Sequence, residues 1–81
     1  MTNKEEILKT NLEARENEVM MYQINIDNYT LALEEIENLS SDEQDELADF
    51  KQQLANVLTT EKLEQKKAKI MLSVLKKQLR A

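Results

Sequence analysis

Bulky, mostly apolar residues recur through the first half of the chain at steps that alternate between four and three residues. The series is Leu8, Leu12, Arg15, Val19, Tyr22, Ile26, Tyr29, Leu33 and Ile36, in which Arg15 is the one charged member. This spacing aligns the side chains along one side of an α-helix, as in the seven-residue repeat of a coiled-coil seam. Thr2 and Glu5 have the spacing of a capping box. The pattern therefore predicts a helix from about residue 3 to about residue 38.

The second half of the chain carries a similar series. Its members are Leu47, Phe50, Leu54, Val57, Glu61, Glu64, Ala68, Met71, Leu75 and Gln78. Ser40 and Glu43 have the spacing of a second capping box, which is typical of a helix N-terminus. We therefore expect a turn over about residues 39–41 and a second helix over about residues 42–80.

The short connection predicts that the two helices fold back on each other in an antiparallel arrangement. Positions whose numbers sum to 83 then face each other, which pairs Tyr29 with Leu54 and Leu8 with Leu75. The predicted fold class is all-α: a long antiparallel two-helix hairpin, coiled-coil-like, forming a single domain over residues 1–81.

Two alternatives to this hairpin remain open. The second helix could break at Thr59-Thr60, because β-branched hydroxyl residues can cap a helix, although the seven-residue repeat continues unchanged through both residues. Two chains could also exchange their second helices to form an open, extended dimer.

The residue types that the chain lacks exclude several classes of site. The 81 residues include no Cys, His, Gly or Pro. Disulfides, ordinary zinc sites, Cys–His catalysis and Gly-rich phosphate loops are therefore impossible. A narrow helical hairpin also offers no enclosed pocket that could shift the pKa values of its carboxylates. We expect no enzymatic activity, no cofactor and no metal site.

The two predicted seams leave many apolar residues without a contact. Those that we expect to contact a partner are Met20, Met21, Ile24, Leu31, Leu58, Ile70, Leu72, Val74 and Leu79. Continuous apolar surface on a small soluble protein marks an interface. A single hairpin also has a small core, and oligomerisation is one way to stabilise it. We therefore expect a homodimer or higher oligomer, preferably a dimer that completes a four-helix bundle, with a groove for a foreign helix as the alternative.

A cluster of polar residues interrupts the predicted seam near its middle. The pairing rule places Tyr22 opposite Glu61, and Arg15 close to Glu64. A charged pair inside a seam costs desolvation energy, and its best-attested role is to define register and oligomeric state. We expect this role for Arg15, Tyr22, Glu61 and Glu64, with a small-ligand or partner pocket as the alternative.

Charge is distributed unevenly along a chain whose formal net charge is −5. The bases near the C-terminus that could bind an anion are Lys62, Lys66, Lys67, Lys69, Lys76, Lys77 and Arg80. A basic amphipathic helix can bind nucleic acid or an anionic membrane surface. No aromatic residue lies among these bases, and the hairpin places them beside acids of the first helix, which argues against nucleic acid. The acids expected at the solvated turn end are Glu34, Glu35, Glu37, Asp42, Glu43, Asp45, Glu46 and Asp49.

These features favour a non-enzymatic protein–protein interaction module, such as an oligomeric adaptor, a chaperone-like factor or a small inhibitor of a protein partner. The alternatives are a binder of nucleic acid or of an anionic surface, and a purely structural coiled-coil assembly element. Because no apolar run reaches the length of a signal peptide or membrane span, we expect a cytoplasmic protein.

Overall fold

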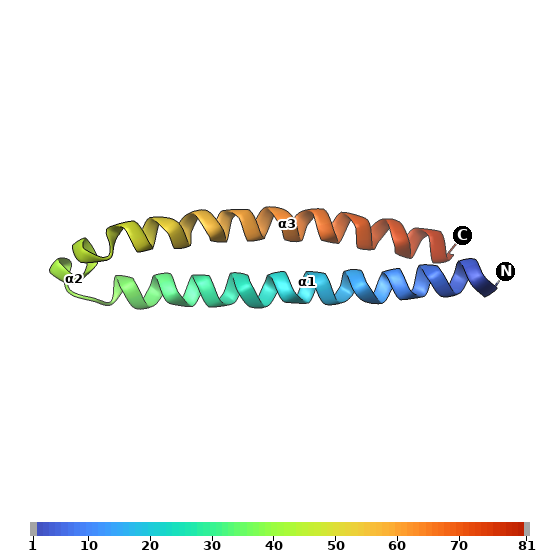
Figure 1. Cartoon of the computed structure of the whole chain (residues 1–81), viewed down its shortest axis with the longest axis horizontal. Helices are drawn as coiled ribbons and strands as arrows, with labels where there is room; N and C mark the ends of the chain where they lie inside the picture. Colours follow the sequence, from blue (N-terminus) through green and yellow to red (C-terminus); the bar gives the residue numbers. More distant parts are fainter. Residues whose placement is uncertain (1, 81) are drawn as a thin grey trace.

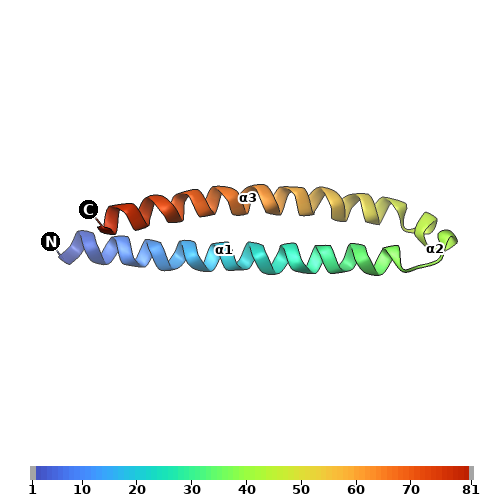
Figure 2. The ribbon, with the colours of Figure 1, turned by 180° about the vertical axis from the view of Figure 1, so that it is seen from behind.

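The protein is an all-α hairpin, and the computed structural model describes residues 2–80 of it. Its helices are α1 (Thr2–Glu37), α2 (Ser41–Glu46) and α3 (Ala48–Arg80). The long helices α1 and α3 lie side by side and antiparallel along their whole length, so that both chain ends lie at one end of the molecule and α2 at the other (Figures 1 and 2). Two long helices packed antiparallel confirm the predicted hairpin.

The hairpin is a single layer in which each long helix packs against only one other long helix. Its extents are 64 × 14 × 14 Å, and its radius of gyration is 18.3 Å. A globular chain of this length would have a radius of gyration of about 12 Å. The accessible surface is 6233 Å², whereas a compact globular protein of this mass would expose about 5,000 Å². Much of each helix surface is therefore left without a contact inside the chain.

The turn between α1 and α2 is built without glycine and without any residue of positive φ within residues 2–80. Ser40 caps α2 from an extended conformation (φ −64°, ψ 160°), and its Oγ accepts a hydrogen bond from the backbone N–H of Glu43. The side-chain Nε2 of Gln44 donates to the carbonyl oxygens of Glu37 (3.2 Å) and Leu39 (2.9 Å). These bonds satisfy carbonyl groups at the end of α1 that would otherwise lack a partner. The side chain of Thr2, on which the first predicted capping box depends, lies outside the described residues.

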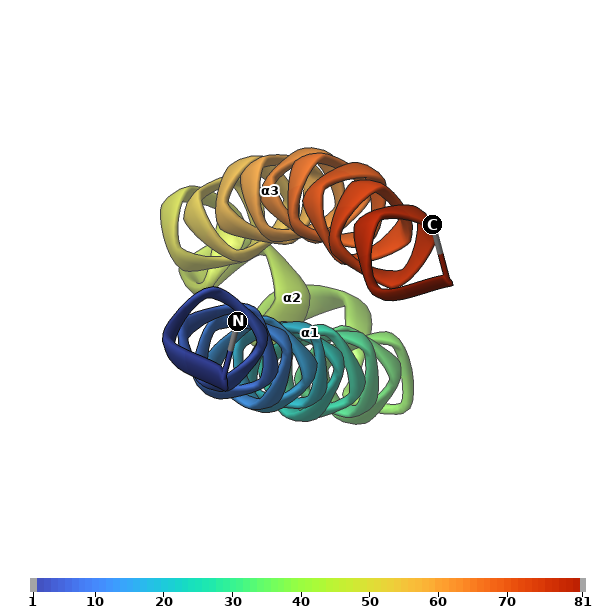
Figure 3. The ribbon, with the colours of Figure 1, turned by 90° about the vertical axis from the view of Figure 1, so that its right-hand side faces the viewer.

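The helix expected from residue 42 onward is divided at Leu47. This residue leaves the helical conformation (φ −102°, ψ 13°), and its N–H is shared between the carbonyl oxygens of Glu43 (3.2 Å) and Gln44 (3.1 Å). The helix restarts at once, because the N–H of Lys51 donates to the carbonyl of Leu47 at 2.8 Å. The bend allows α2 to bridge the two long helices at the tip (Figure 3).

No break occurs at Thr59-Thr60, and the alternative with a third helix from that point is contradicted. The Thr59 Oγ1 donates to the carbonyl of Ala55 at 3.0 Å, and the Thr60 Oγ1 donates to the carbonyl of Asn56 at 3.1 Å. Hydroxyl groups that bond to the preceding turn are compatible with a continuous helix. The helix α3 therefore runs without interruption from Ala48 to Arg80.

The side of α1 that packs against α3 is the one predicted from sequence. All the positions of the first series are buried or half-buried, and the deepest are Ile26 and Ile36, the latter 4% exposed. This half of the predicted seam is confirmed.

The predicted side of α3 is only partly correct. Leu54, Glu61, Ala68 and Leu75 do face α1, but the second line of the seam is shifted by one residue along the chain. The predicted line was Phe50, Val57, Glu64, Met71 and Gln78, whereas the observed line is Lys51, Leu58, Gln65, Leu72 and Leu79. Phe50 remains 49% exposed and Met71 43% exposed. The prediction for this line is therefore wrong.

The physical reason for the shift lies at the middle of α3. Apolar residues flank the line of Leu54 and Leu75 on both sides, so hydrophobic burial alone does not choose between them. The observed rotation buries the amide of Gln65 and leaves the carboxyl group of Glu64 half-buried, whereas the predicted rotation would place Glu64 in the seam. Burying an amide that forms hydrogen bonds costs less free energy than burying a carboxylate.

Candidate functional site

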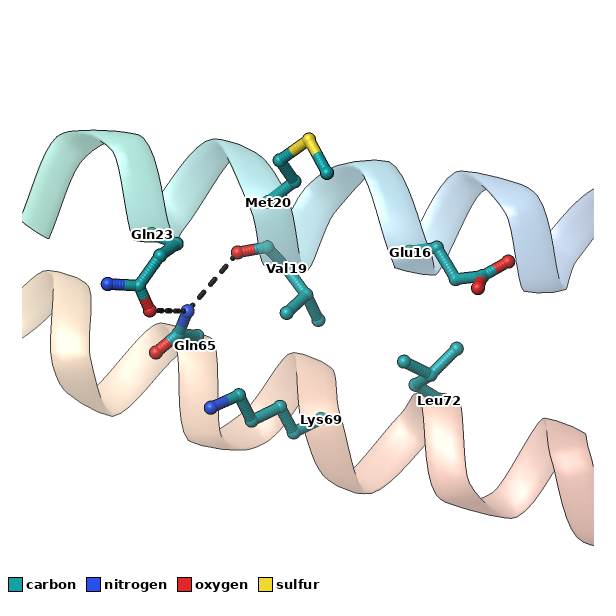
Figure 4. Close-up of a pocket in the computed structure, with 7 residues that line it drawn as sticks. All are labelled: Glu16, Val19, Met20, Gln23, Gln65, Lys69 and Leu72. Atoms are coloured by element: carbon teal, nitrogen blue, oxygen red, sulfur yellow. Dashed lines mark hydrogen bonds between the residues drawn. The ribbon is translucent and has the colours of Figure 1, made fainter.

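The buried polar residue at the middle of the seam is Gln65, which is 7% exposed. Its side chain rises from α3 toward α1, where Nε2 donates to the carbonyl oxygen of Val19 (3.2 Å) and to Oε1 of Gln23 (2.9 Å; Figure 4). Within residues 2–80 no other side-chain hydrogen bond joins the two long helices. A single satisfied polar residue in a seam favours one register over others.

The sequence predicts a polar contact between the two helices at Arg15 and Glu64. In the structure Gln65 makes the polar contact between the helices. The signal was present in the sequence, because Gln65 falls in a seven-residue series with Leu58, Leu72 and Leu79. The two bonds of Gln65 also depart from the pairing rule by one and by five residues. The partners of Gln65, at positions 19 and 23, give sums of 84 and 88 in place of 83.

The polar patch predicted around Tyr22 is arranged differently from the prediction. The Arg15 Nη1 donates to Oε2 of Glu18 on its own helix at 2.8 Å, and the Lys67 Nζ pairs with Oε1 of Glu64 at 3.1 Å. The expected contact between Arg15 and Glu64 is thus replaced by two pairs within single helices. Glu61 lies in the seam, and its Oε2 is buried without a hydrogen-bond partner in the described part of the chain.

The same residues still form one electrostatic group. Desolvation raises the pKa of the Tyr22 phenol above 10.0, and the negative charges of three carboxylates raise it further, while Arg15 acts in the opposite direction. In order of effect, these carboxylates are Glu18, Glu64 and Glu61. We call Arg15, Glu18, Tyr22, Glu61 and Glu64 the central cluster. It carries an excess of negative charge, although no acidic group in residues 2–80 is arranged to hold a metal ion.

The raised pKa of Tyr22 can be measured directly. In a Tyr29→Phe variant the phenolate absorbance reports Tyr22 alone, and adding Glu64→Gln is expected to lower the pKa of Tyr22 because a nearby negative charge is removed. Since folding favours the neutral phenol, this contribution to stability is complete below pH 10.0 and is lost as the pH rises through the folded-state pKa. Glu35→Gln is the control, because Glu35 is not among the charges that act on Tyr22. An unchanged pKa in the Glu64→Gln variant would contradict the cluster.

The residues expected to contact a partner fall into two groups. Leu58, Leu72 and Leu79 are half-buried between the long helices, so they contribute to the hairpin itself. The others are exposed: Met20, Met21, Ile24, Leu31, Ile70 and Val74. Sequence reasoning missed further exposed apolar residues, namely Ile7, Phe50, Val57, Leu63 and Met71. Most of these were missed because Phe50, Val57 and Met71 had been assigned to the seam.

Many of the exposed apolar residues share one side of the hairpin. Ala14 and Met71 line the same groove between α1 and α3, together with residues of the central cluster. Ile7 and Met21 are each seven residues from Ala14, and the exposed apolar side chains of α3 at the same heptad position as Met71 are Phe50 and Val57. Residues seven apart lie on the same side of such a helix.

With Val74, which lies three residues after Met71, these residues form what we call the apolar face: Ile7, Met21, Phe50, Val57, Met71 and Val74. Ile24, Leu31, Leu63 and Ile70 belong to a different heptad position, on the outer sides of the two helices.

The opposite side of the hairpin is predominantly charged. Its groove is lined by Glu16, Val19, Met20, Gln23, Gln65, Lys69 and Leu72, and Met20 points away from α3 (Figure 4). The basic residues that share this side with Lys69 at helical spacing are Lys62, Lys66, Lys76 and Arg80. None of them forms an ion pair within residues 2–80, whereas Lys67 pairs with Glu64 on the other side. Because Glu16 shares the groove with Lys69, acids of α1 offset part of this positive charge.

The two ends of the hairpin carry opposite charge. The tip around α2 holds Glu34, Glu35, Glu37, Asp42, Glu43, Asp45, Glu46 and Asp49, against Lys51 as its one base. At the other end, the last turns of α3 carry Lys69, Lys76, Lys77 and Arg80 and no acid. The first turns of α1 at this end carry Lys4 and Lys9 against Glu5, Glu6 and Glu13, so the positive excess here is smaller than the negative excess of the tip. The 64 Å length of the molecule separates these charges.

The function of the hairpin has to be inferred from its surfaces. None of the helices in the described part of the chain combines the length and the hydropathy that crossing a bilayer requires. The chain matches no model of a protein family, no curated protein sequence and no solved structure.

Proposed function

We propose that this chain is a non-enzymatic protein–protein interaction module that self-associates into a four-helix bundle and offers its remaining apolar surface to another protein. The observation that carries the proposal is the number of large apolar side chains that an extended hairpin leaves exposed. Exposed apolar surface of this extent on a small protein is typical of an interface.

The thin core supports the same proposal. No large side chain within the described residues is less than 2% exposed, since each long helix packs against only one other long helix. Apolar burial contributes about 25 cal/mol per Å², so side chains that are half-exposed in the hairpin can contribute further stability in an assembly. Association with a partner therefore stabilises the hairpin.

Sedimentation equilibrium of the purified chain tests self-association, and we expect dimers or larger oligomers whose population rises with concentration. Affinity capture from a lysate of the native host tests the second half of the proposal. Ile24→Asp is expected to abolish capture of a stoichiometric foreign partner, because Ile24 is exposed on the outer side of α1. Asn17→Asp, at the same heptad position, is the matched control. A chain that remains monomeric and captures no stoichiometric partner would contradict the proposal.

A second candidate function is supported by the basic residues on the charged side of α3. The unpaired cations of this side could bind a polyanion or an anionic bilayer, and such binding would weaken steeply as salt is raised. Absence of binding to either ligand at low salt would exclude this function. A purely structural assembly element would instead self-associate without any stoichiometric foreign partner.

A further inference from the structure

The apolar face lies on one side of the hairpin, and the opposite side is charged. We propose that a second copy of this chain covers the apolar face, turned end for end about a twofold axis level with Met21. In this dimer α1 lies over α1 of the second copy, and α3 lies over α3 of the second copy. The inference rests on the proposed self-association and specifies its face and its orientation.

The dimensions of the face suit a partner of the same size. Its footprint, the product of the 64 Å length and the 14 Å width, is roughly 900 Å². A standard stable interface buries about 800 Å² on each partner. A second hairpin would cover the whole length of the face, whereas a single short helix would leave half of it exposed.

The position of the axis follows from the contact of Gln65. Because Gln65 bonds both to Val19 and to Gln23, the middle of α3, at residues 64 and 65, lies level with Met21, which is within two residues of the middle of α1. An axis at this level overlaps the two copies over their full length. It brings Met21 close to Met21 of the second copy.

This axis also matches apolar residues along α3. Each residue of α3 faces the residue of the second copy's α3 that lies equally far from residue 64 in the opposite direction along the chain. Val57 then faces Met71 of the second copy, and Phe50 lies close to Val74 of the second copy. Each of these pairs occurs twice in the dimer because of the symmetry.

The charges of the two ends select the same orientation. Turning one copy end for end places each acidic tip beside the basic end of the other copy. A parallel dimer, with its axis along the hairpin, would place the two acidic tips together. Since like charges at close range are unfavourable and opposite charges are attractive, the end-for-end dimer has the lower electrostatic energy.

The centre of the face has complementary charges as well. Lys67 of the second copy lies level with Glu61 and close to Glu64 in this arrangement. Glu61 has a buried carboxylate oxygen without a hydrogen-bond partner, and Glu64 already lies 3.1 Å from its own Lys67. The two Lys67 side chains near the axis therefore reduce the repulsion between the carboxylates of the two central clusters.

Along α1 the end-for-end dimer places Ala14 level with Asn28 and Ile7 level with Glu35 of the second copy, so its apolar contacts lie at Met21 and along α3. A parallel dimer through the same face lacks those contacts. It would place α1 over α3 of the second copy at the same level, so that Val57 faces Asn28 and Phe50 faces Glu35. Met71 would face Ala14, the one apolar contact of the set.

Cysteine cross-linking distinguishes the two orientations, because the natural chain has no Cys. A disulfide forms only where the two Cα atoms come within about 7 Å. Under mild oxidation Met21→Cys alone is expected to form a covalent dimer. An equimolar mixture of the Val57→Cys and Met71→Cys chains is expected to form the mixed dimer. The mixture of Asn28→Cys and Val57→Cys reports the parallel dimer and is expected to stay uncross-linked.

Sedimentation equilibrium of an interface variant completes the test. Val57→Asp is expected to weaken dimerisation by about tenfold or more, because a desolvated carboxylate faces Met71 of the second copy. Leu63→Asp, on the outer side of α3, is the matched control and is expected to leave the dissociation constant within about twofold. Circular dichroism of both variants verifies that they remain helical. If either aspartate variant fails to fold, the cysteine cross-links still test the orientation of the dimer.

The possible results separate this inference from the proposed function. A dimer that forms the Met21 and the Val57–Met71 cross-links supports both. A dimer that forms the Asn28–Val57 cross-link, or that Leu63→Asp dissociates and Val57→Asp does not, overturns the inference and leaves self-association intact. A chain that stays monomeric at every concentration overturns the inference together with the self-association on which it rests.

Discussion

Leu72→Asp is expected to unfold the hairpin, with a loss of about 4 kcal/mol in the free energy of unfolding. Leu72 is half-buried in the seam between α3 and α1, close to Val19 and level with Glu16 (Figure 4). The substitution removes apolar burial worth about 2 kcal/mol and adds a carboxylate that is partly desolvated and has an acid nearby. A hairpin with so thin a core has little stability in reserve, so the variant should lose its helical structure at 25 °C.

Urea unfolding followed by circular dichroism measures this effect. Ile70→Asp is the matched control, because Ile70 lies two residues away on the same helix but is 63% exposed on its outer side. It should change the free energy of unfolding by about 0.5 kcal/mol or less. Unfolding by Met71→Asp together with tolerance of Leu72→Asp would contradict the observed seam and support the one predicted from the sequence.

Gln65→Leu is expected to stabilise the hairpin by about 1–2 kcal/mol and to make its register less unique. The substitution replaces a buried amide by an apolar side chain of similar size. It leaves no buried group without a partner, because the carbonyl of Val19 belongs to a helix and Gln23 is exposed to solvent. The polar contact that favours one register over its neighbours is lost at the same time.

Thermal unfolding measures the first effect, and amide NMR spectra measure the second through additional or broadened signals. Gln65→Ala is the comparison, since it loses the same hydrogen bonds without regaining apolar contact, and it should lower the melting temperature. Gln23→Ala removes only the exposed acceptor and should have little effect. A lower stability of Gln65→Leu would mean that the hydrogen bonds of Gln65 outweigh the gain in apolar burial.

The arms of the hairpin and one side of its core could be predicted from local pattern. The first series of α1 continues over nine positions with Arg15 as its one charged member, whereas the other large apolar residues of α1 form only shorter series. The capping signal at Ser40 marked the start of α2 because a hydroxyl three residues before an N–H forms its bond within one turn. Such signals depend on residues close in sequence, and they were therefore readable without the fold.

The polar and apolar surfaces that carry the proposed function could not be predicted in this way. Three apolar or mixed lines run along α3, and rotation of the helix by one line decides whether Leu72 or Met71 is buried. That choice depends on Gln65 reaching Val19 across the seam, a contact between residues far apart in the chain. As a result Phe50, Val57 and Met71 moved from the predicted core to the apolar face, and Leu58, Leu72 and Leu79 moved from the predicted interface to the core.

The turn shows the same division. Its position followed from Ser40, but the end of α1 is completed by Gln44, which bonds to the carbonyl oxygens of Glu37 and Leu39 from the next helix. The bend at Leu47 likewise brings α3 onto α1. Leu47 is not of a capping residue type, and no Gly or Pro near it predicts a break in the helix.

Helix type, the length of α1, chain reversal and the contacting side of α1 are thus properties of the local sequence, because hydrogen bonds within a turn and a seven-residue repeat establish them. The rotation of α3, the register of the seam and the location of the exposed apolar face arise when α1 and α3 meet. They depend on the relative desolvation cost of Gln65 and Glu64, which exists only once the two helices pack together.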